Sequence, residues 1–290
     1  MSARTGARRR LAPYLLVLPG GLWLAAFFVI PTVLMLSLSL QTGSIEEGFR
    51  LTWHFSTYAD AISLYHTQLV RSLVYSAAVT AIALVLSYPM AYWIAFHGGR
   101  RKSTYLFLIL LPFFVSFVIR TVSWQFILSD QGILLGPLKS LGLLPEDFHL
   151  LATAWAVIGG LTYNFLPFMV LPLYVSLERI DPSLVEAAND LYASKAQGFL
   201  RVILPLSLPG VFAGVLLTFV PAAADFVNAT ILGGATTTMI GSLIQTEYLT
   251  NNDYPLASAL SFSLMAALLV GVFAYARALG TEDVLEVSAT

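Results

Sequence analysis

Long apolar runs, separated by short polar segments, dominate the chain. A helix needs about 20 mostly apolar residues to cross the hydrocarbon core of a membrane, at ~1.5 Å rise per residue. Six runs are long enough, and they cover residues 14–40, 72–96, 105–128, 151–177, 209–233 and 256–276. The pattern predicts an all-α, polytopic membrane protein with a six-helix transmembrane domain over residues 14–276, a preceding segment 1–13 and a tail 277–290.

The composition agrees with this prediction. Of the 290 residues, 58% are hydrophobic and 11% are charged, whereas soluble domains carry about a quarter charged residues. The formal net charge of −1, without a long basic tract, argues against a nucleic acid partner. Because the chain has no cysteine, disulfides, thiolate metal sites and cysteine nucleophiles are excluded.

Basic residues predict the orientation of the spans. The first run follows a cluster of arginines but is longer than a signal peptide and lacks a small-residue cleavage site, so we interpret it as a retained anchor. With the N-terminus inside, 11 Lys and Arg residues lie on the inner side and 3 on the outer side. This bias predicts a multi-pass membrane protein with both termini in the cytoplasm.

Motifs for several kinds of chemistry are missing. The sequence has no G-x-x-x-x-G-K-[ST] phosphate loop, so we expect no ATP bound in that way. It has no H-E-x-x-H motif, and His54, His66, His97 and His149 fall outside the six runs. We therefore expect no metal site, no cofactor in this chain and no catalytic residue, which argues against an enzyme.

Prolines interrupt most of the runs. Each proline removes a backbone donor and loosens the helix at the preceding turn. Two interpretations stay open, namely ordinary kinking of membrane helices and kinked helices that line a pathway. Prolines inside the runs include Pro31, Pro89, Pro112, Pro167, Pro172 and Pro221.

The inner segment between the fourth and fifth runs, residues 178–207, contains an amphipathic stretch. Asp181 followed by Pro182 predicts a helix start. The apolar stripe beside the acidic residues Glu186 and Asp190 needs cover that the short loop cannot supply, which favours docking into a groove of a soluble partner. The alternative is a helix that lies on the lipid surface. The stripe consists of Leu184, Ala187, Ala188 and Leu191.

This segment resembles a known motif. Glu186-Ala187-Ala188, followed by a hydrophobic stretch that ends at Ile203-Leu204-Pro205, resembles the EAA loop of ABC importer membrane subunits. Further similar segments, including 88–92, 221–234 and 252–259, resemble the spermidine/putrescine type of this family. The resemblance implies a permease subunit of the bacterial inner membrane that forms half of the path for a small cationic solute, expected to be a polyamine, and works by alternating access.

The resemblance also implies partners. They are a second membrane permease subunit, two ATPase subunits that carry ATP and Mg²⁺, and an extracytoplasmic solute-binding protein. The EAA segment corresponds to the coupling helix that contacts the ATPase. The residues to which it assigns this contact are Glu186, Ala187, Ala188, Leu191, Tyr192, Ala193 and Ser194.

Tyr192 departs from the family pattern, because it stands where the family has glycine. Glycine is usual where a turn needs a positive φ or a close backbone approach. If the turn persists, a tyrosine there costs on the order of 1 to 2 kcal/mol. Either the turn differs, or the ATPase groove accommodates the ring; an ordinary interface aromatic is the third interpretation.

Two charged residues fall inside the apolar runs, where transfer of a charge from water into lipid is unfavourable. On straight helices Arg120 and Asp225 would each lie about 23 to 24 Å from the inner end. Asp225 matches an acidic position of the family, so we expect it to receive a substrate ammonium, with aromatic side chains alongside. Arg120 pairs with Asp225 in a second hypothesis, or reaches the outer headgroups in a third. The other predicted path residues are Trp124, Tyr163, Phe226 and Asn228.

Two other functions stay open at this point. The same type of subunit could serve another solute, such as ferric ion, thiamine or a phosphonate. A signalling or structural membrane protein could use the loop 178–207 to dock a cytosolic partner without transport.

Overall fold

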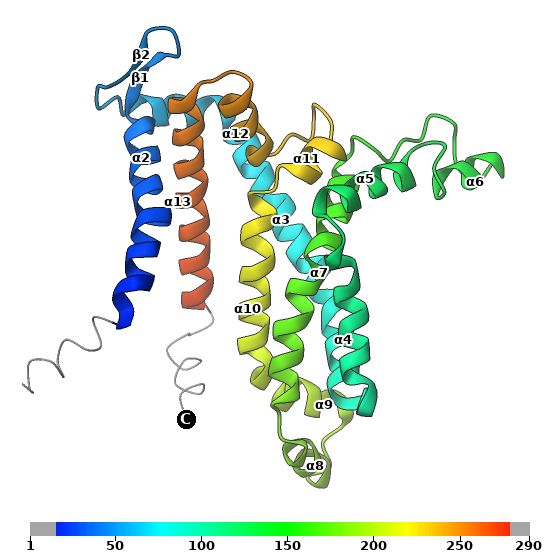
Figure 1. Ribbon diagram of the computed structural model, residues 1–290. Helices are drawn as coiled ribbons and strands as arrows, with labels where there is room; N and C mark the ends of the chain where they lie inside the picture. Colours follow the sequence, from blue (N-terminus) through cyan, green and yellow to red (C-terminus); the bar gives the residue numbers. More distant parts are fainter. Residues whose placement is uncertain (1–15, 279–290) are drawn as a thin grey trace, which may run out of the picture. The chain divides into compact units, whose positions relative to one another are not determined.

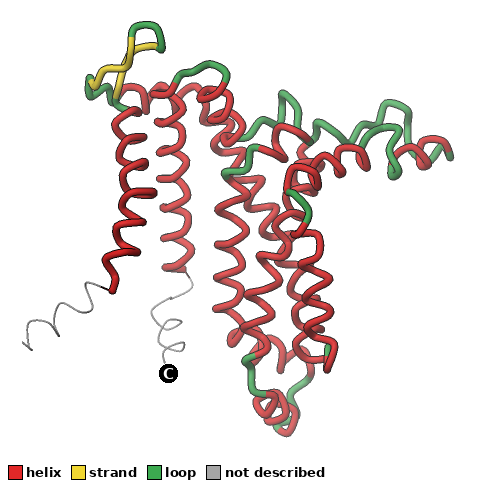
Figure 2. The backbone as a smooth tube through the Cα atoms, in the orientation of Figure 1, coloured by secondary structure: helices red, strands yellow, loops and turns green. Residues whose placement is uncertain are grey.

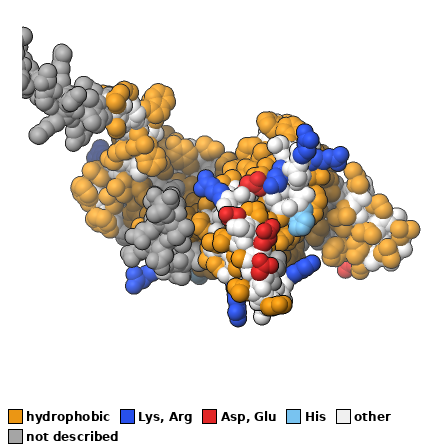
Figure 3. Space-filling model, turned by 90° about the horizontal axis from the view of Figure 1, so that it is seen from below, with side chains coloured by type: hydrophobic (Ala, Val, Ile, Leu, Met, Phe, Trp, Pro, Cys, Tyr) orange, Lys and Arg blue, Asp and Glu red, His pale blue; other side chains and the backbone are white. Residues whose placement is uncertain are grey.

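The computed structural model describes residues 16–278, and most of them are helical (Figures 1 and 2). Within these residues, five helices are long and apolar enough to cross a membrane, and a bent pair of helices makes a sixth candidate. Many large apolar side chains are exposed on them, as Figure 3 shows for one face. The prediction of an all-α, polytopic membrane protein is confirmed. The predicted terminal segments lie outside the described residues, apart from residues 277 and 278 of the tail.

The candidate spans are Leu16–Ser39, Ser56–His97, Ala154–Glu178, Lys195–Ala223 and Tyr254–Arg277, with the bent pair Gly99–Phe114 and Phe117–Leu128. The elements along the chain are η1 (Ala25–Val29), α2 (Ile30–Ser39), β1 (Gln41–Ser44), β2 (Gly48–Leu51), α3 (Ser56–His97), η2 (Gly99–Arg101), α4 (Lys102–Leu110), η3 (Leu111–Phe114), α5 (Phe117–Leu128), α6 (Leu135–Ser140), α7 (Ala154–Glu178), α8 (Pro182–Asp190), α9 (Lys195–Gly198), η4 (Phe199–Ile203), α10 (Leu204–Ala223), α11 (Val227–Ile231), α12 (Ile240–Leu249) and α13 (Tyr254–Ala278).

The third predicted run, 105–128, is not one straight span. The helix breaks after Phe114, where Val115 and Ser116 leave the helical backbone conformation, and α5 lies at 89° to the preceding helix. Pro112 stands in the last turn before the break, where its missing N–H weakens the helix. The expectation that Arg120 lies on one straight span is therefore wrong, because α5 turns away from the direction of α4.

The fifth predicted run, 209–233, has different bounds. Its helical span begins at Lys195 and ends at Ala223. Asp225 follows the end of α10, and the short helix α11 begins two residues later. The predicted intramembrane aspartate therefore lies in the connection after the span rather than inside the helix.

The chain divides into two compact units. One unit includes residues 16–64 and 246–263, with α2, the β1–β2 hairpin and the start of α3. The hairpin is antiparallel and pairs Gln41 with Leu51 and Ser44 with Gly48. This small sheet has no counterpart in the sequence prediction, which assigned the segment to a loop.

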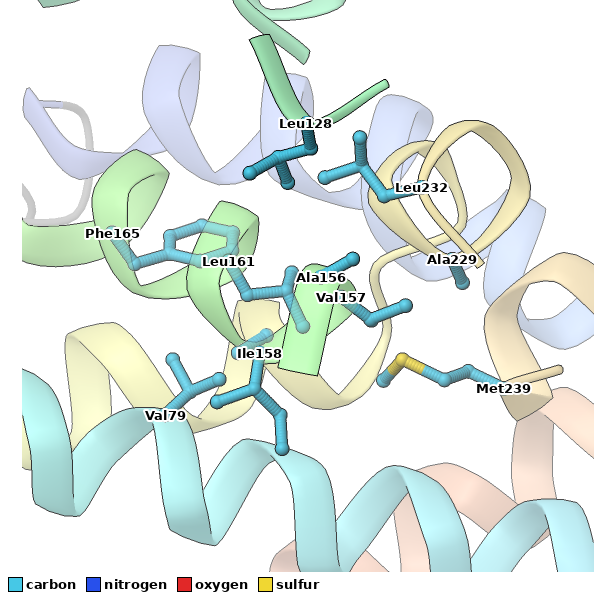
Figure 4. Packing of buried hydrophobic residues seen from close by; sticks show 11 residues of the cluster. Val79, Leu128, Ala156, Val157, Ile158, Leu161, Phe165, Ala229, Leu232 and Met239 are labelled. Atoms are coloured by element: carbon cyan, nitrogen blue, oxygen red, sulfur yellow. The ribbon is translucent and has the colours of Figure 1, made fainter. Parts of the chain in front are cut away.

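The other unit includes residues 65–245, and α7 lies at its centre. One core cluster joins α7 to α3, α5, α10 and α11 (Figure 4). A second cluster joins the following turns of α7 to α3 and η4. The first contains Val79, Leu128, Ala156, Val157, Ile158, Leu161, Phe165, Ala222, Ala229, Leu232 and Met239. Because so much of α7 is buried, it positions the elements that carry the candidate sites.

Helices α7 and α10 pack closely because Gly210 has no side chain. A Cβ atom at Gly210 would lie 2.6 Å from the carbonyl oxygen of Pro172 and 2.5 Å from Cβ of Ser176. Small residues at such contacts let membrane helices approach each other. The close packing ties the helix that follows the 178–207 segment to the helix that precedes it.

Candidate functional site

The predicted amphipathic helix of the inner loop is present as α8, Pro182–Asp190. Asp181 caps its start, because the backbone N–H of Ser183 donates to Oδ1 of Asp181 at 2.9 Å. This backbone hydrogen bond, together with one from the side chain of Ser183, holds the pKa of the Asp181 carboxyl below its ordinary value. Proline at the first helical position needs no backbone partner there. The helix start predicted from Asp181 and Pro182 is confirmed.

The end of α8 is closed by a turn that glycine usually makes. The N–H of Ala193 donates to the carbonyl of Ala188 at 3.1 Å, which is the six-to-one bond of a Schellman motif. Tyr192 takes the left-handed position of this motif with φ +59°. The turn expected from the family glycine therefore persists in this chain, with tyrosine in the place of glycine.

The side chains at this turn point away from the protein. Tyr192 is 98% exposed and Leu191 is 82% exposed. Glu186, Ala187 and Ser194 are also exposed, whereas Ala188 and Ala193 are partly buried. Figure 3 looks onto the end of the molecule that carries α8 and shows charged and apolar side chains together there. The predicted contact residues thus form a surface that can receive a partner.

The loop is also held firmly at its return to the membrane helices. Ser194 and Gln197 form a capping box, with N–H of Gln197 donating to Oγ of Ser194 at 3.3 Å and N–H of Ser194 donating to Oε1 of Gln197 at 2.9 Å. At the other end, Lys102 forms a salt bridge of 2.9 Å with Glu178. The segment between α7 and α10 is consequently held in a defined conformation at both of its ends.

The second candidate site surrounds Asp225, which is 8% exposed. Its Oδ1 accepts hydrogen bonds from the backbone N–H of Asn228 at 2.7 Å and from Nδ2 of Asn228 at 3.2 Å. The structure thus brings two predicted path residues together. These bonds give the carboxylate a local role, because they fix the start of α11.

Two residues of this site were missed by the sequence reasoning. Nδ2 of Asn164 donates to Oδ1 of Asn228 at 3.1 Å and to Oγ1 of Thr121 at 3.3 Å. Oγ1 of Thr121 also donates to Oδ1 of Asn228 at 3.3 Å. Asn164 lies in the middle of an apolar run, and a buried amide there needs partners, which is the signal that could have revealed it. The buried network links α5, α7 and α11.

The predicted aromatic residues divide into two groups. Trp124 and Tyr163 form an edge-to-face pair with ring centroids 5.3 Å apart. Phe226 follows Asp225 directly and is 43% exposed. Trp124 and Tyr163 come from α5 and α7, the same helices that carry Thr121 and Asn164.

Arg120 does not share a salt bridge with Asp225 in this structure. Its guanidinium carbon instead lies 5.6 Å from the ring centroid of Phe113 and 5.7 Å from that of Phe117. Asp225 is held by Asn228, as described above. The two charges therefore have different surroundings here.

An exposed cluster closes the segment between α5 and α7. Oδ2 of Asp130 lies 2.6 Å from Nδ1 of His149, and Oδ1 of Asp130 accepts a hydrogen bond from Nζ of Lys139 at 3.3 Å. Desolvation alone would raise the pKa of Asp130, but the hydrogen bonds from His149 and Lys139 outweigh it and lower this pKa. The stabilisation by this carboxylate is therefore present at neutral pH and is lost as the pH falls through the lowered pKa. Within residues 16–278, no group of three His, Asp or Glu side chains could hold a metal ion.

Comparison with protein families gives one match that covers most of the chain. Residues 87–279 match the model of the binding-protein-dependent transport system inner membrane component. The chain is 39% identical over 259 residues to the spermidine/putrescine transport system permease protein PotB of Haemophilus influenzae, covering 88% of this chain and 90% of that protein. It is 35% identical over 257 residues to PotB of Escherichia coli K12, covering 88% and 94%.

Solved structures with the same fold are also transporters. A bacterial ABC transporter that imports the acidic polysaccharide alginate matches with a TM-score of 0.69 and 20% identity, covering 95% of this chain and 97% of that chain. The alginate transporter in complex with its alginate-bound periplasmic protein matches with a TM-score of 0.65 and 19% identity, covering 94% and 95%. At this identity the similarity shows the fold alone.

Proposed function

Because this chain belongs to the family of inner membrane components of binding-protein-dependent transport systems, we propose that it forms half of the import path for a polyamine such as spermidine or putrescine. It is a multi-pass protein of the bacterial inner membrane and a transport permease subunit of a system with further subunits. The support for the polyamine is the identity to PotB proteins over nearly the whole of both chains.

The proposed assembly contains a second membrane subunit, two ATPase subunits that bind ATP and Mg²⁺, and an extracytoplasmic solute-binding protein. Both termini are then cytoplasmic, and α8 faces the cytosol. The observation that carries this proposal is the exposed apolar turn at Leu191 and Tyr192, held by a capped helix. A rigid helix with an exposed apolar end fits a groove in a soluble partner.

The short connections of α8 to α7 and α10 suggest how ATP binding could change the conformation of the import path. The ATPase subunits would move α8 when they close on ATP, and the short connections to α7 and α10 would transmit the movement. Because Gly210 keeps α7 and α10 in close contact, the pair would move together. ATP must bind more tightly to one state of the assembly for this movement to be driven.

Reconstitution tests the proposal. The chain is co-purified with the ATPase subunit, the second membrane subunit and the binding protein encoded beside it, and the complex is placed in proteoliposomes. We expect spermidine or putrescine with binding protein to stimulate ATP hydrolysis severalfold, and labelled polyamine to accumulate only with ATP.

Competing solutes decide between the remaining alternatives. Ferric ion, thiamine and a phosphonate are tested at matched concentration, the phosphonate because Arg120 is a buried cation. Stimulation by one of these solutes and not by a polyamine would overturn the substrate class. A chain that retains no ATPase subunit would instead support a membrane protein that docks another cytosolic partner.

Replacing Asp225 by asparagine tests whether its charge serves the solute. Asparagine retains a carbonyl oxygen that can accept the N–H of Asn228, so α11 should keep its start. Because only the charge is lost, we expect the complex to assemble and the apparent affinity for spermidine to fall on the order of tenfold, equivalent to about 1.4 kcal/mol. Uptake by D225A, which loses the cap as well, is the comparison. Unchanged affinity and rate in D225N would show that Asp225 acts only as the cap.

A further inference from the structure

Arg120 is a buried charge with unsatisfied hydrogen-bond donors. It is 7% exposed, and its Nε and Nη1 atoms are buried without a hydrogen-bond partner. Its guanidinium carbon lies over the faces of Phe113 and Phe117. Ring faces attract a cation but do not satisfy its N–H donors, and a buried charge normally requires an ion pair or hydrogen bonds.

A pocket of about 360 Å³ opens beside this guanidinium. It is lined by Arg120, Asn164 and the aromatic rings of Phe113, Phe114 and Phe168, among others. Oδ1 of Asn164 is also buried without a partner. Two buried polar side chains with unused hydrogen-bonding capacity thus line one open space, and an oxygen-bearing anionic group would satisfy the donors of Arg120.

The described part of this chain supplies no such group. None of the salt bridges within residues 16–278 involves Arg120. Asp225, the counterpart considered from the sequence, accepts hydrogen bonds from Asn228 instead. A polyamine carries positive charges and would be repelled by Arg120. The acceptor must therefore come from another molecule.

Depth argues against a lipid phosphate as this acceptor. The helix from Gly99 to Phe114 has 16 residues, which is about 24 Å at 1.5 Å per residue. The hydrocarbon core is about 30 Å thick. Because α5 turns by 89° directly after this helix, Arg120 does not continue toward the outer headgroups along the direction of α4.

A larger groove lies next to this pocket on α7. Phe168 lines both this pocket and a groove of about 720 Å³ between α7 and α10. The groove extends from Phe168 past Pro172 and Ser176 to Arg179 and Asp181 near α8. Most of the side chains that line the groove are apolar, alongside the polar Ser176, Arg179 and Asp181, and a concave apolar face of this kind fits a protein neighbour.

We propose that this face of α4, α5, α7 and α10 contacts the second membrane subunit, and that an acidic side chain of that subunit enters the pocket and pairs with Arg120. The inference rests on the proposed function, which supplies the second membrane subunit. The pair would form only in the assembly and would fix the register of the two subunits. Removing one partner of a buried ion pair leaves the other uncompensated, which weakens association strongly.

Photo-crosslinking tests the neighbour in an otherwise unchanged complex. The crosslinking amino acid p-benzoylphenylalanine replaces Phe114, which lines the pocket and is 78% exposed. The control places it at Val85, which is 70% exposed on α3 and lines neither pocket. We expect irradiation to join the second membrane subunit to position 114 and not to position 85. Adducts with phospholipid alone at position 114 would overturn the proposal.

Substitution of Arg120 tests the charge. In R120Q we expect the amount of second membrane subunit retained after detergent extraction to fall about tenfold, with a smaller loss in R120K. The matched change Q125L, at an exposed polar position on the same helix, should retain the subunit. R120E should lose the subunit and recover it when the acidic residue found in the crosslinked peptide is changed to arginine.

These outcomes separate the two proposals. Failure of the wild-type complex to transport would count against the proposed function, whatever Arg120 does. A transporting wild-type complex in which R120Q retains the second subunit at the wild-type level would overturn the pairing alone.

Discussion

Replacing Gly210 by leucine should prevent α7 and α10 from packing and remove most of the folded protein from the membrane. A Cβ atom at this position would lie 2.6 Å from the carbonyl oxygen of Pro172. Because that atom belongs to the backbone of α7, no side-chain rotation relieves the contact. Overpacking in a core costs about 1–3 kcal/mol and more where the backbone must move. We expect the yield of monodisperse protein in size-exclusion chromatography to fall about tenfold or more, which corresponds to at least ~1.4 kcal/mol.

The control for this prediction lies on the partner helix. Gly159 belongs to α7, and a Cβ atom there would meet nothing within 4 Å. G159L should therefore accumulate close to the wild-type level, and G210A should fall between G159L and G210L. Equal yields of G159L and G210L would show that the loss comes from general intolerance of bulk in these helices and not from the α7–α10 contact.

Local features of the structure could be predicted from the sequence. The start of α8 follows from Asp181 and Pro182, because capping depends on neighbours within one turn. The left-handed turn at Tyr192 follows from the family glycine at that position. Hydropathy locates the apolar runs because the cost of polar groups in lipid acts on each segment separately.

Tertiary features could not be predicted in the same way. The break after Phe114 lies in a uniformly apolar stretch, so hydropathy cannot distinguish a straight span from a bent pair. The partners of Asn164 come from α5 and α11, and the spacing along α7 does not reveal them. For the same reason the pairing of Arg120 with Asp225 was a hypothesis that spacing alone could not decide.

Replacing Leu191 by aspartate should release the ATPase subunits from the complex. Leu191 is 82% exposed at the end of α8, and the proposed partner groove would bury it. An aspartate there would carry an unpaired charge into the interface. Truncation of an anchor residue alone costs 2 kcal/mol or more in typical interfaces, so we expect the affinity for the ATPase to fall about 30-fold or more. This affinity is measured by binding of the ATPase subunit to the detergent-solubilised membrane subunits immobilised on a sensor surface.

The matched control uses Leu141, which is 72% exposed in the segment between α5 and α7, on the predicted outer side. L141D should leave the affinity for the ATPase unchanged, because that side of the membrane does not meet the ATPase. Equal effects of L141D and L191D would indicate a general loss of folding and would contradict docking at α8.

Tyr192 allows the ring and the backbone to be tested separately. Y192G keeps the left-handed turn and removes its strain, because this conformation costs a non-glycine residue about 1–2 kcal/mol. Helix α8 should therefore be at least as stable as in the wild type. If the ring inserts into the groove, Y192G should nevertheless bind the ATPase about tenfold less tightly, equivalent to ~1.4 kcal/mol. Unchanged or tighter binding would mean that the ATPase groove contacts the backbone turn and that the tyrosine ring lies outside the groove. The backbone strain at Tyr192 would then not be offset by tighter binding of the ATPase. A loss of affinity in Y192G would instead explain why this chain keeps tyrosine at a position suited to glycine.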